Sequence, residues 1–484
     1  KHMASLSLGF FERERSGRLV ARVTNDAEAV EKLVTDELVR ILAEFTFLAG
    51  AAAILFFLDV RLAAAAFSVI PFIVLATFAF QKKARSFYQD LRERVATVLS
   101  FFQETLRGVH VVRAFAQERT SSRQFEEVND AWGTAKIGTL RLSAEYFARV
   151  DLLSSFGTAT VLVYGGSRVL NGELSIGKLF AFIVFLALFF DPLHHLSERY
   201  TTFQSAMAGL ARIAQLFQVE PEIVDHDNPV TLNKVQGNIA FQGTDFRYNR
   251  AAPFALQNVN IDVMAGTTLA LVGPTGAGKS TFVKLLARFY DVSKGSILID
   301  GLDIRRISLQ SLRSHMALVP QEGFLFGGTI ADNIRFGNPH ASDSQIEQVC
   351  MKLGIDEFIR GLTEGYETQV RERGARLAAG ERQLIALARA LIADPSIILL
   401  DEATSSLDSA TEARVQQAFR AALVGRTCVV SAHRLSTVMH ADKIAVVEQG
   451  RIVEAGTHSE LVSKQGRYAD LYGSWLSGAT ATRV

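Results

Sequence analysis

The chain has 484 residues, which is enough for two or three domains, and 49% of them are hydrophobic. Its 51 Lys and Arg residues balance 50 Asp and Glu residues, so its charge does not indicate a nucleic-acid partner. Cys350 and Cys428 are its only cysteines, and both lie in the C-terminal half. Two isolated cysteines in a domain of cytosolic type are expected to be reduced and structural.

Residues 1–218 contain long apolar runs that are separated by charged amphipathic stretches. A helix needs about 20 apolar residues to cross a bilayer, and four of the runs are long enough to do so. Short turns join the first run to the second and the third to the fourth. The four predicted membrane-spanning runs are residues 38–58, 62–80, 151–169 and 176–192.

The connection between the second and third runs, residues 81–149, is rich in Lys and Arg. The positive-inside rule therefore places this connection and both chain ends in the cytosol, and the two short turns outside. Its apolar residues recur at helical spacing, as at Val95, Val98, Leu99 and Phe102, so the spanning helices are expected to extend into the cytosol. The alternative is that the four runs are buried helices of a large soluble domain, which run length and charge asymmetry disfavour.

Residues 219–235 form a polar linker that contains Pro221 and Pro229. Residues 236–484 then alternate short apolar strands with helices and Gly-rich turns, a pattern typical of an α/β domain. We therefore expect an all-α transmembrane helical domain with long intracellular helices over residues 1–218, followed by an α/β domain over residues 236–484.

Residues 273–280 fit the phosphate-binding P-loop pattern of glycines followed by Lys and Ser. An apolar strand over residues 269–272 precedes this loop and a helix follows it, which is the context that the motif requires. Lys279 is expected to reach the β- and γ-phosphates of a nucleotide, and the Ser280 hydroxyl to ligate Mg²⁺. The α/β domain is therefore predicted to be a P-loop NTPase, with nucleotide-binding residues Gly273, Pro274, Thr275, Gly276, Ala277, Gly278, Lys279, Ser280 and Thr281.

A second apolar strand, over residues 396–400, ends in Asp401 and Glu402. The pattern predicts two carboxylates at the carboxyl edge of a parallel sheet, where such sheets bind ligands. Asp401 is expected to hold Mg²⁺ and Glu402 to polarise the attacking water. Shortly before this strand, residues 377–381 open an Ala- and Leu-rich helix whose first N–H groups can bind a phosphate.

In this order the motifs resemble the Walker A, signature and Walker B motifs of the ATP-binding cassette (ABC) family. The resemblance implies ATP and Mg²⁺ as cofactors. Tyr248 resembles the aromatic residue that stacks on adenine, with a core strand tyrosine as the alternative, and Asp408 falls in the D-loop. Gln321 resembles the Q-loop glutamine, and His433 the switch histidine that contacts the γ-phosphate. The resemblance thus implies catalytic roles for Glu402, His433, Gln321 and Lys279, and metal-binding roles for Ser280, Gln321 and Asp401.

The membrane part has its own resemblance to ABC exporters. Segments within residues 6–26 are similar to the first intracellular loop of these exporters, residues 104–115 to the second, and residues 171–177 to the last outer turn. Glu372 is similar to a loop residue that contacts the intracellular helices, with a solvated surface charge as the alternative. Exporters of this kind have six spanning helices per half, so the chain resembles a half-transporter that lacks its first two.

In this family two cassettes bind ATP between them, and each site takes its signature from the opposite chain. The resemblance therefore implies a dimer with a second half-transporter in a cell membrane, with the cassettes in the cytoplasm. The expected function is ATP-driven export of an unknown substrate across the lipid bilayer. The alternatives are a non-transporting regulator or ATP-gated channel component, and a soluble ABC ATPase, which the spanning runs disfavour.

The signature departs from the family pattern Leu-Ser-Gly-Gly-Gln at Ala378, Ala379 and Glu381. Ala378 cannot donate the hydrogen bond that the family's serine gives to the γ-phosphate, a loss of about 1.5–3 kcal/mol, and Glu381 adds an acid near phosphate. ATP hydrolysis is therefore expected to be slow at the site to which the chain contributes Ala378, Gly380 and Glu381. The chain's own Walker residues are complete. This favours a heterodimer with unequal sites, and a homodimer with tolerated substitutions stays open.

Overall fold

The computed structural model describes residues 2–481 except 15, 322, 371–373, 375–376, 402–408 and 433–434. The chain divides into two compact units, one formed by Lys1–Ser16 with Val219–Val484 and the other by Gly17–Gln218. The first sixteen residues thus group with the C-terminal part, whereas the sequence placed them in a domain over residues 1–218. The difference arises because α2 (Leu8–Arg13) packs against Tyr290 of the C-terminal part.

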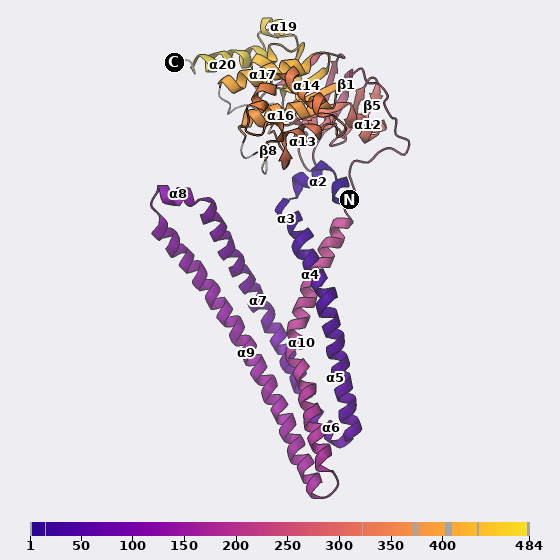
Figure 1. Cartoon of the computed structure of the whole chain (residues 1–484), viewed down its shortest axis with the longest axis vertical. Coiled ribbons are helices and arrows are strands. Elements are labelled where there is room, and N and C mark those ends of the chain that lie inside the picture. Colours follow the sequence, from indigo (N-terminus) through magenta and orange to yellow (C-terminus); the bar gives the residue numbers. More distant parts are fainter. Residues whose placement is uncertain are drawn as a thin grey trace. The chain divides into compact units, whose positions relative to one another are not determined.

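The helical unit consists of long helices joined by short turns (Figure 1). Its first helix passes through two π-helical segments before it ends at Leu58. α7 and α9 lie side by side with α8 at one end of the pair, and α10 packs along α5 and α9 (Figure 1). The elements are α3 (Ser16–Ala21), η1 (Arg22–Asp26), α4 (Ala27–Lys32), η2 (Leu33–Glu37), α5 (Leu38–Leu58), α6 (Val60–Phe67), α7 (Ile70–Arg107), α8 (Val109–Ala114), α9 (Glu118–Leu170) and α10 (Ile176–Phe217).

Two helices in the described part of the chain are long and apolar enough to cross a membrane, Gly17–Leu58 and Val60–Arg107. A shorter apolar helical stretch covers Ile176–Phe190. The first two predicted spans fall within the two long helices, and the last two lie in α9 and α10. Helices also extend well beyond the predicted spans, as the sequence predicted, because α7 continues to Arg107 and α9 already begins at Glu118.

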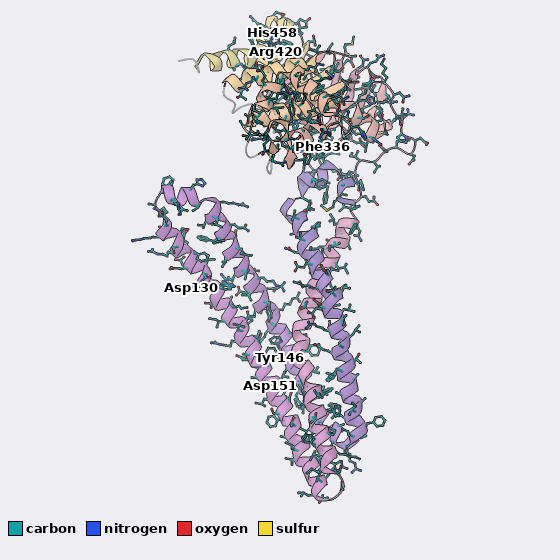
Figure 2. All side chains as sticks on the ribbon, in the orientation of Figure 1. Asp130, Tyr146, Asp151, Phe336, Arg420 and His458 are labelled. Atoms are coloured by element: carbon teal, nitrogen blue, oxygen red, sulfur yellow. The ribbon has the colours of Figure 1, made fainter. Side chains whose placement is uncertain are left out.

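Small residues allow close helix packing in the buried part of this unit. A Cβ atom at Gly165 of α9 would lie 2.5 Å from Leu179 of α10 and 3.2 Å from Leu62 of α6. Nearer the start of α9, Tyr146 (Figure 2) stacks on Phe80 of α7 with ring centroids 4.4 Å apart. Its hydroxyl is 3.1 Å from the Thr77 hydroxyl, so this buried polar group has a hydrogen-bond partner.

One arginine joins the two turns that are predicted to lie outside the membrane. Asp59, between α5 and α6, accepts hydrogen bonds from the backbone N–H groups of Arg61 and Leu62 at 3.0 and 2.9 Å, and so caps α6. Arg168 of α9 donates to Asp59 at 2.7 Å and to Glu173, in the α9–α10 turn, at 3.2 Å. The side chains of Arg168 and Asp59 are only 14% and 15% exposed, so solvent screens this pair less than a surface ion pair.

The α/β unit contains a six-stranded sheet in the order β12-β11-β3-β10-β9-β6, in which only β12 is antiparallel to its neighbour. A four-stranded antiparallel sheet has the order β2-β1-β4-β5, and β7 pairs with β8. The strands are β1 (Ile239–Phe246), β2 (Leu256–Val263), β3 (Thr268–Val272), β4 (Lys294–Ile299), β5 (Leu302–Asp303), β6 (Met316–Val319), β7 (Gly328–Thr329), β8 (Gln369–Val370), β9 (Ile397–Asp401), β10 (Thr427–Ser431), β11 (Lys443–Glu448) and β12 (Arg451–Gly456).

Helices cover both faces of the parallel sheet, with a hydrophobic core on each side. Cys350 and Cys428 are free and buried in one of these cores, and burial raises the pKa of their thiols to about 11 and about 12. This confirms the prediction that the two cysteines are reduced and structural. The helices are α1 (His2–Ser5), α2 (Leu8–Arg13), α11 (Lys279–Leu286), η3 (Ile304–Arg306), α12 (Leu309–Ser314), α13 (Ile330–Arg335), α14 (Asp343–Leu353), α15 (Asp356–Arg360), η4 (Gly365–Glu367), α16 (Ala379–Ile392), α17 (Ser409–Leu423), α18 (Leu435–Val438), α19 (His458–Ser463) and α20 (Arg467–Ala481).

Candidate nucleotide site

The predicted P-loop connects the central strand β3 to the start of α11, as the motif requires. Its glycines are needed for backbone geometry and for space. Gly273 has φ +146°, and a Cβ there would lie 2.1 Å from the Val447 carbonyl oxygen. Gly278 has φ +111°, and a Cβ there would lie 2.7 Å from the Ala255 carbonyl oxygen. The loop therefore packs against the body of the domain in a way that only glycine permits.

Lys279 lies inside this loop and is only 5% exposed. Its Nζ donates hydrogen bonds to the carbonyl oxygens of Gly273 at 2.8 Å and Pro274 at 3.0 Å. Burial lowers the pKa of Lys279, while the nearby Asp401 carboxylate opposes this shift. Two neutral carbonyl groups are poor compensation for a buried ammonium, so an anion at the loop would be strongly favoured.

Ser280, the second residue of α11, lies at the carboxyl end of β9. Its hydroxyl donates a hydrogen bond to Oδ1 of Asp401 at 3.1 Å. The structure thus brings together the serine of the P-loop and the first acid of the predicted Walker B strand. Hydroxyl and carboxylate oxygens are the ligand types that Mg²⁺ prefers, so Ser280 and Asp401 fit the predicted metal site.

Tyr248 lies beside the first turn of α11, where its hydroxyl is 3.0 Å from that of Thr281. Tyr248 is 38% exposed, and its ring contacts that of Tyr290 edge-on with centroids 5.2 Å apart. Lys284 Nζ lies 5.8 Å from the centroid of the Tyr248 ring. A half-exposed aromatic ring next to the P-loop helix is available for a planar base, in contrast to a tyrosine fully enclosed in the core.

Gln321 follows β6, which lies beside β9 in the sheet. Because Val319 pairs with Leu400, the chain leaves β6 at the same edge as Asp401. The Gln321 side chain is exposed there. The structure therefore places the predicted Q-loop residue at the same sheet edge as the Walker residues.

The predicted signature residues lie at the start of α16. Ala378 and Ala379 are exposed and Gly380 is buried. Glu381 bends back, and its Oε2 accepts a hydrogen bond from the Ala378 N–H at 2.8 Å. The sequence suggested only an acid near phosphate, whereas the structure shows this carboxylate capping its own helix, as an acid at the third helical position often does.

Four predicted functional residues, Glu402, Asp408, His433 and Glu372, lie outside the described residues. The strands that lead to Glu402 and His433 are described. β9 and β10 are adjacent and parallel, with Asp401 beside Ser431. The chain therefore runs from this one sheet edge into both predicted catalytic segments.

The structure adds a group that sequence reasoning missed, formed by Glu12, Lys284 and Tyr290. Glu12 of α2 accepts hydrogen bonds from Lys284 Nζ at 2.7 Å and from the Tyr290 hydroxyl at 2.6 Å. A Cβ atom at Gly9 would lie 2.8 Å from the Tyr290 ring, so α2 packs tightly on it. Burial would raise the pKa of Glu12, but these hydrogen bonds outweigh it and hold the pKa below its usual value. Through Lys284 and Tyr290, α2 is joined to the Tyr248 ring.

Replacing Glu12 with Gln is expected to reduce the free energy of unfolding by about 1 kcal/mol at pH 7, because the charge-assisted part of two hydrogen bonds is lost. The folded-state pKa of Glu12 is lowered, so its stabilisation is present above the unfolded pKa of about 4.3 and is lost as the pH falls through the folded value. Thermal unfolding of the detergent-solubilised chain should therefore separate the variant from the wild type at pH 7, and the separation should shrink as the pH falls below about 4.

Arg13→Gln is the matched control for this prediction. Arg13 lies on the same helix, and its ion pair with Glu222 joins side chains that are 55% and 46% exposed. The control should change stability little, since pairs this exposed contribute about 0–1 kcal/mol. A Glu12→Gln variant whose stability tracked the wild type at every pH would contradict the role of this contact.

The P-loop, the paired serine and acid, and the signature helix together define a P-loop ATPase domain of the ABC type. Residues 256–405 match the family described as ABC transporter, and residues 1–193 match the ABC transporter transmembrane region. The chain belongs to the ABC transporter family. It is an exporter-type half-transporter, with a helical membrane part and an ATPase domain in one polypeptide.

Several relatives match nearly the whole chain. An ABC transporter ATP-binding protein of Bacillus subtilis, YknV, is 39% identical over 99% of this chain and 79% of its own length. The ATP-dependent lipid A-core flippase of Syntrophus aciditrophicus is 35% identical over 96% of this chain and 77% of its own. A putative multidrug export ATP-binding/permease protein of Staphylococcus aureus is 36% identical over 97% of this chain and 82% of its own.

A solved structure of a bacterial Atm1-family ABC exporter with ATP bound superposes with a TM-score of 0.80 and 31% identity, over 98% of this chain and 83% of that chain. These matches confirm the predicted fold class, a helical transmembrane part followed by an α/β ABC cassette. They also confirm an ATPase that is coupled to transport, located in a membrane with its cassette in the cytoplasm.

Proposed function

We propose that this chain binds Mg·ATP at its P-loop and hydrolyses it at a site that a second half-transporter completes. The observation that supports this most directly is the meeting of Lys279, Ser280 and Asp401, with the Ser280 hydroxyl 3.1 Å from the Asp401 carboxylate. Lys279 would exchange its two carbonyl partners for phosphate oxygens. Ser280 and Asp401 would hold Mg²⁺, which when bound neutralises charge on the phosphates.

The remaining roles follow the family order. Glu402 would polarise the attacking water, Gln321 would orient it from the neighbouring strand end, and His433 would contact the γ-phosphate. Tyr248 would stack on the adenine, and the P-loop N–H groups would surround the phosphates. Because phosphoryl transfer depends mainly on positioning and charge stabilisation, these residues supply one half of a complete site.

The exposed start of α16 supports the partner part of the proposal. Ala378 and Ala379 are open to solvent at the end of the helix where N–H groups can face the phosphate of an opposite chain. Ala378 has no hydroxyl, and the Glu381 carboxylate already accepts its N–H. This end is therefore a weak phosphate ligand, which supports a heterodimer in which the partner supplies a standard signature to the Walker residues of this chain.

The chain expressed alone should accordingly hydrolyse ATP slowly, and Ala378→Ser combined with Glu381→Gln should raise its turnover about 10-fold. A regained hydrogen bond to a charged phosphate is worth about 1.5 kcal/mol or more, and each 1.4 kcal/mol is a factor of ten. Turnover per cassette in proteoliposomes measures the effect. Rapid, Glu402-dependent hydrolysis by the unaltered chain alone would instead show that no different partner is required.

A further inference from the structure

Ser431 ends β10 directly beside the Walker B acid. In the parallel sheet it lies opposite Asp401 of β9 on one side and Leu271 of β3 on the other. Side chains at paired positions point to the same face of a sheet. This is the face covered by α11, because Leu269 and Leu271 share one buried core with α11 residues. The Ser431 hydroxyl therefore shares a face with the Asp401 carboxylate and with Ser280.

The Ser431 hydroxyl is buried without a hydrogen-bond partner. Ser431 is 0% exposed, and its Oγ has no partner within the part of the chain that the structure describes. Other buried hydroxyls of this unit are paired. Thr244 donates to the Ser296 carbonyl oxygen at 3.0 Å, and Ser311 accepts from the Leu232 N–H at 2.8 Å. A buried hydroxyl without a partner is destabilising. We therefore expect the Ser431 hydroxyl to find its hydrogen-bond partner in the nucleotide-bound state of the site.

The loaded nucleotide site would supply that partner. Neighbouring strands are about 4.8 Å apart, a separation that one water molecule between the two side chains can bridge. Ser280 already donates to one oxygen of Asp401, at 3.1 Å, which leaves the second oxygen for other partners. Bound Mg²⁺ usually keeps several of its waters, and these need hydrogen-bond acceptors around the site.

We propose that Ser431 is a positioning residue of the ATP site, whose hydroxyl binds a magnesium-coordinated water together with Asp401. It fixes the orientation of the Asp401 carboxylate only when Mg·ATP is present, and in the empty protein it has no structural role of its own. This inference rests on the proposed function, in which Ser280 and Asp401 hold the metal.

Ser431→Ala tests the proposal through stability as well as activity. Thermal unfolding of the detergent-solubilised chain would be followed without ligand, with ATP and EDTA, and with ATP and increasing Mg²⁺. Without ligand the variant should unfold at the same temperature as the wild type or higher, and ATP with EDTA should shift both equally. The Mg²⁺ concentration that gives half of the further shift should rise about 3- to 10-fold, as expected for one lost hydrogen bond.

Ser311→Ala is the matched control, because Ser311 is also a buried serine but its hydroxyl has a partner in the empty protein. It should lower the unfolding temperature without ligand and leave the Mg²⁺ midpoint unchanged. If Ser431→Ala had an unchanged Mg²⁺ midpoint, or lost stability without ligand, the inference about Ser431 would be wrong while the proposed metal site would still stand. A wild type whose ATP-induced shift did not depend on Mg²⁺ would overturn the proposed metal site as well.

Discussion

Replacing Glu402 with Gln is expected to lower ATP turnover at least about 100-fold while ATP binding is retained. Gln has nearly the same shape as Glu but cannot accept the proton of the attacking water. General-base contributions of this kind are worth about 10²- to 10⁴-fold in rate. Binding depends on the P-loop residues, so the affinity for Mg·ATP should change by less than about 3-fold. Steady-state hydrolysis and binding of a fluorescent ATP analogue, measured on the same preparation, separate the two quantities.

Glu364→Gln provides the control for charge removal in the same domain, because Glu364 is exposed, follows α15 and belongs to none of the predicted nucleotide-binding motifs. It should hydrolyse ATP like the wild type. Normal hydrolysis by Glu402→Gln would exclude this carboxylate as the base. A parallel loss of ATP binding would show instead that Glu402 holds the nucleotide.

Replacing Lys279 with Met should give the opposite pattern for binding, with loss of both ATP affinity and turnover. Two charge-assisted hydrogen bonds to phosphate, at about 1.5–3 kcal/mol each, correspond to at least about 100-fold in affinity. The empty protein should lose little stability. Its buried ammonium has a lowered pKa because burial disfavours the charge, and Met removes this cost together with the two carbonyl contacts.

Lys294→Met is the matched control, since Lys294 is an exposed lysine at the start of β4. The informative measurement is the increase in unfolding temperature on adding Mg·ATP, which should be absent only in Lys279→Met. A Lys279→Met protein that unfolded much earlier than the wild type without ligand would show that the lysine supports the resting loop itself.

Local patterns explain why parts of this architecture were predictable from the sequence. The P-loop depends on glycines at fixed offsets, and Gly273 and Gly278 occupy positions that no other residue could adopt. The position of Asp401 follows from an apolar strand that ends in acids. Asp59 falls in a turn because it separates two apolar runs, and its side chain then caps the next helix.

Contacts between distant parts of the chain were not predictable in this way. Glu12 and Tyr290 form a hydrogen bond although they are 278 residues apart in the sequence, and no periodicity identifies such a pair. The unpaired hydroxyl of Ser431 depends on which face of a sheet it occupies and on what surrounds it. The helix-capping role of Glu381 did have a local signal, because an acid three residues after the N-cap residue Ala378 often caps its own helix. From the sequence, this residue was interpreted only as an acid near phosphate.

The hydrogen bonds of Arg168 with Asp59 and Glu173 have a mechanical consequence for the long helices. They hold the outer ends of four helices together at one point, so relative tilting of these helices pivots there. α9 has 53 residues and is therefore about 80 Å long. A tilt of about 5° about the Arg168 end would displace the opposite end by about 7 Å, given that length. Small angular changes near the outer turns thus correspond to large displacements where α8 joins α7 and α9.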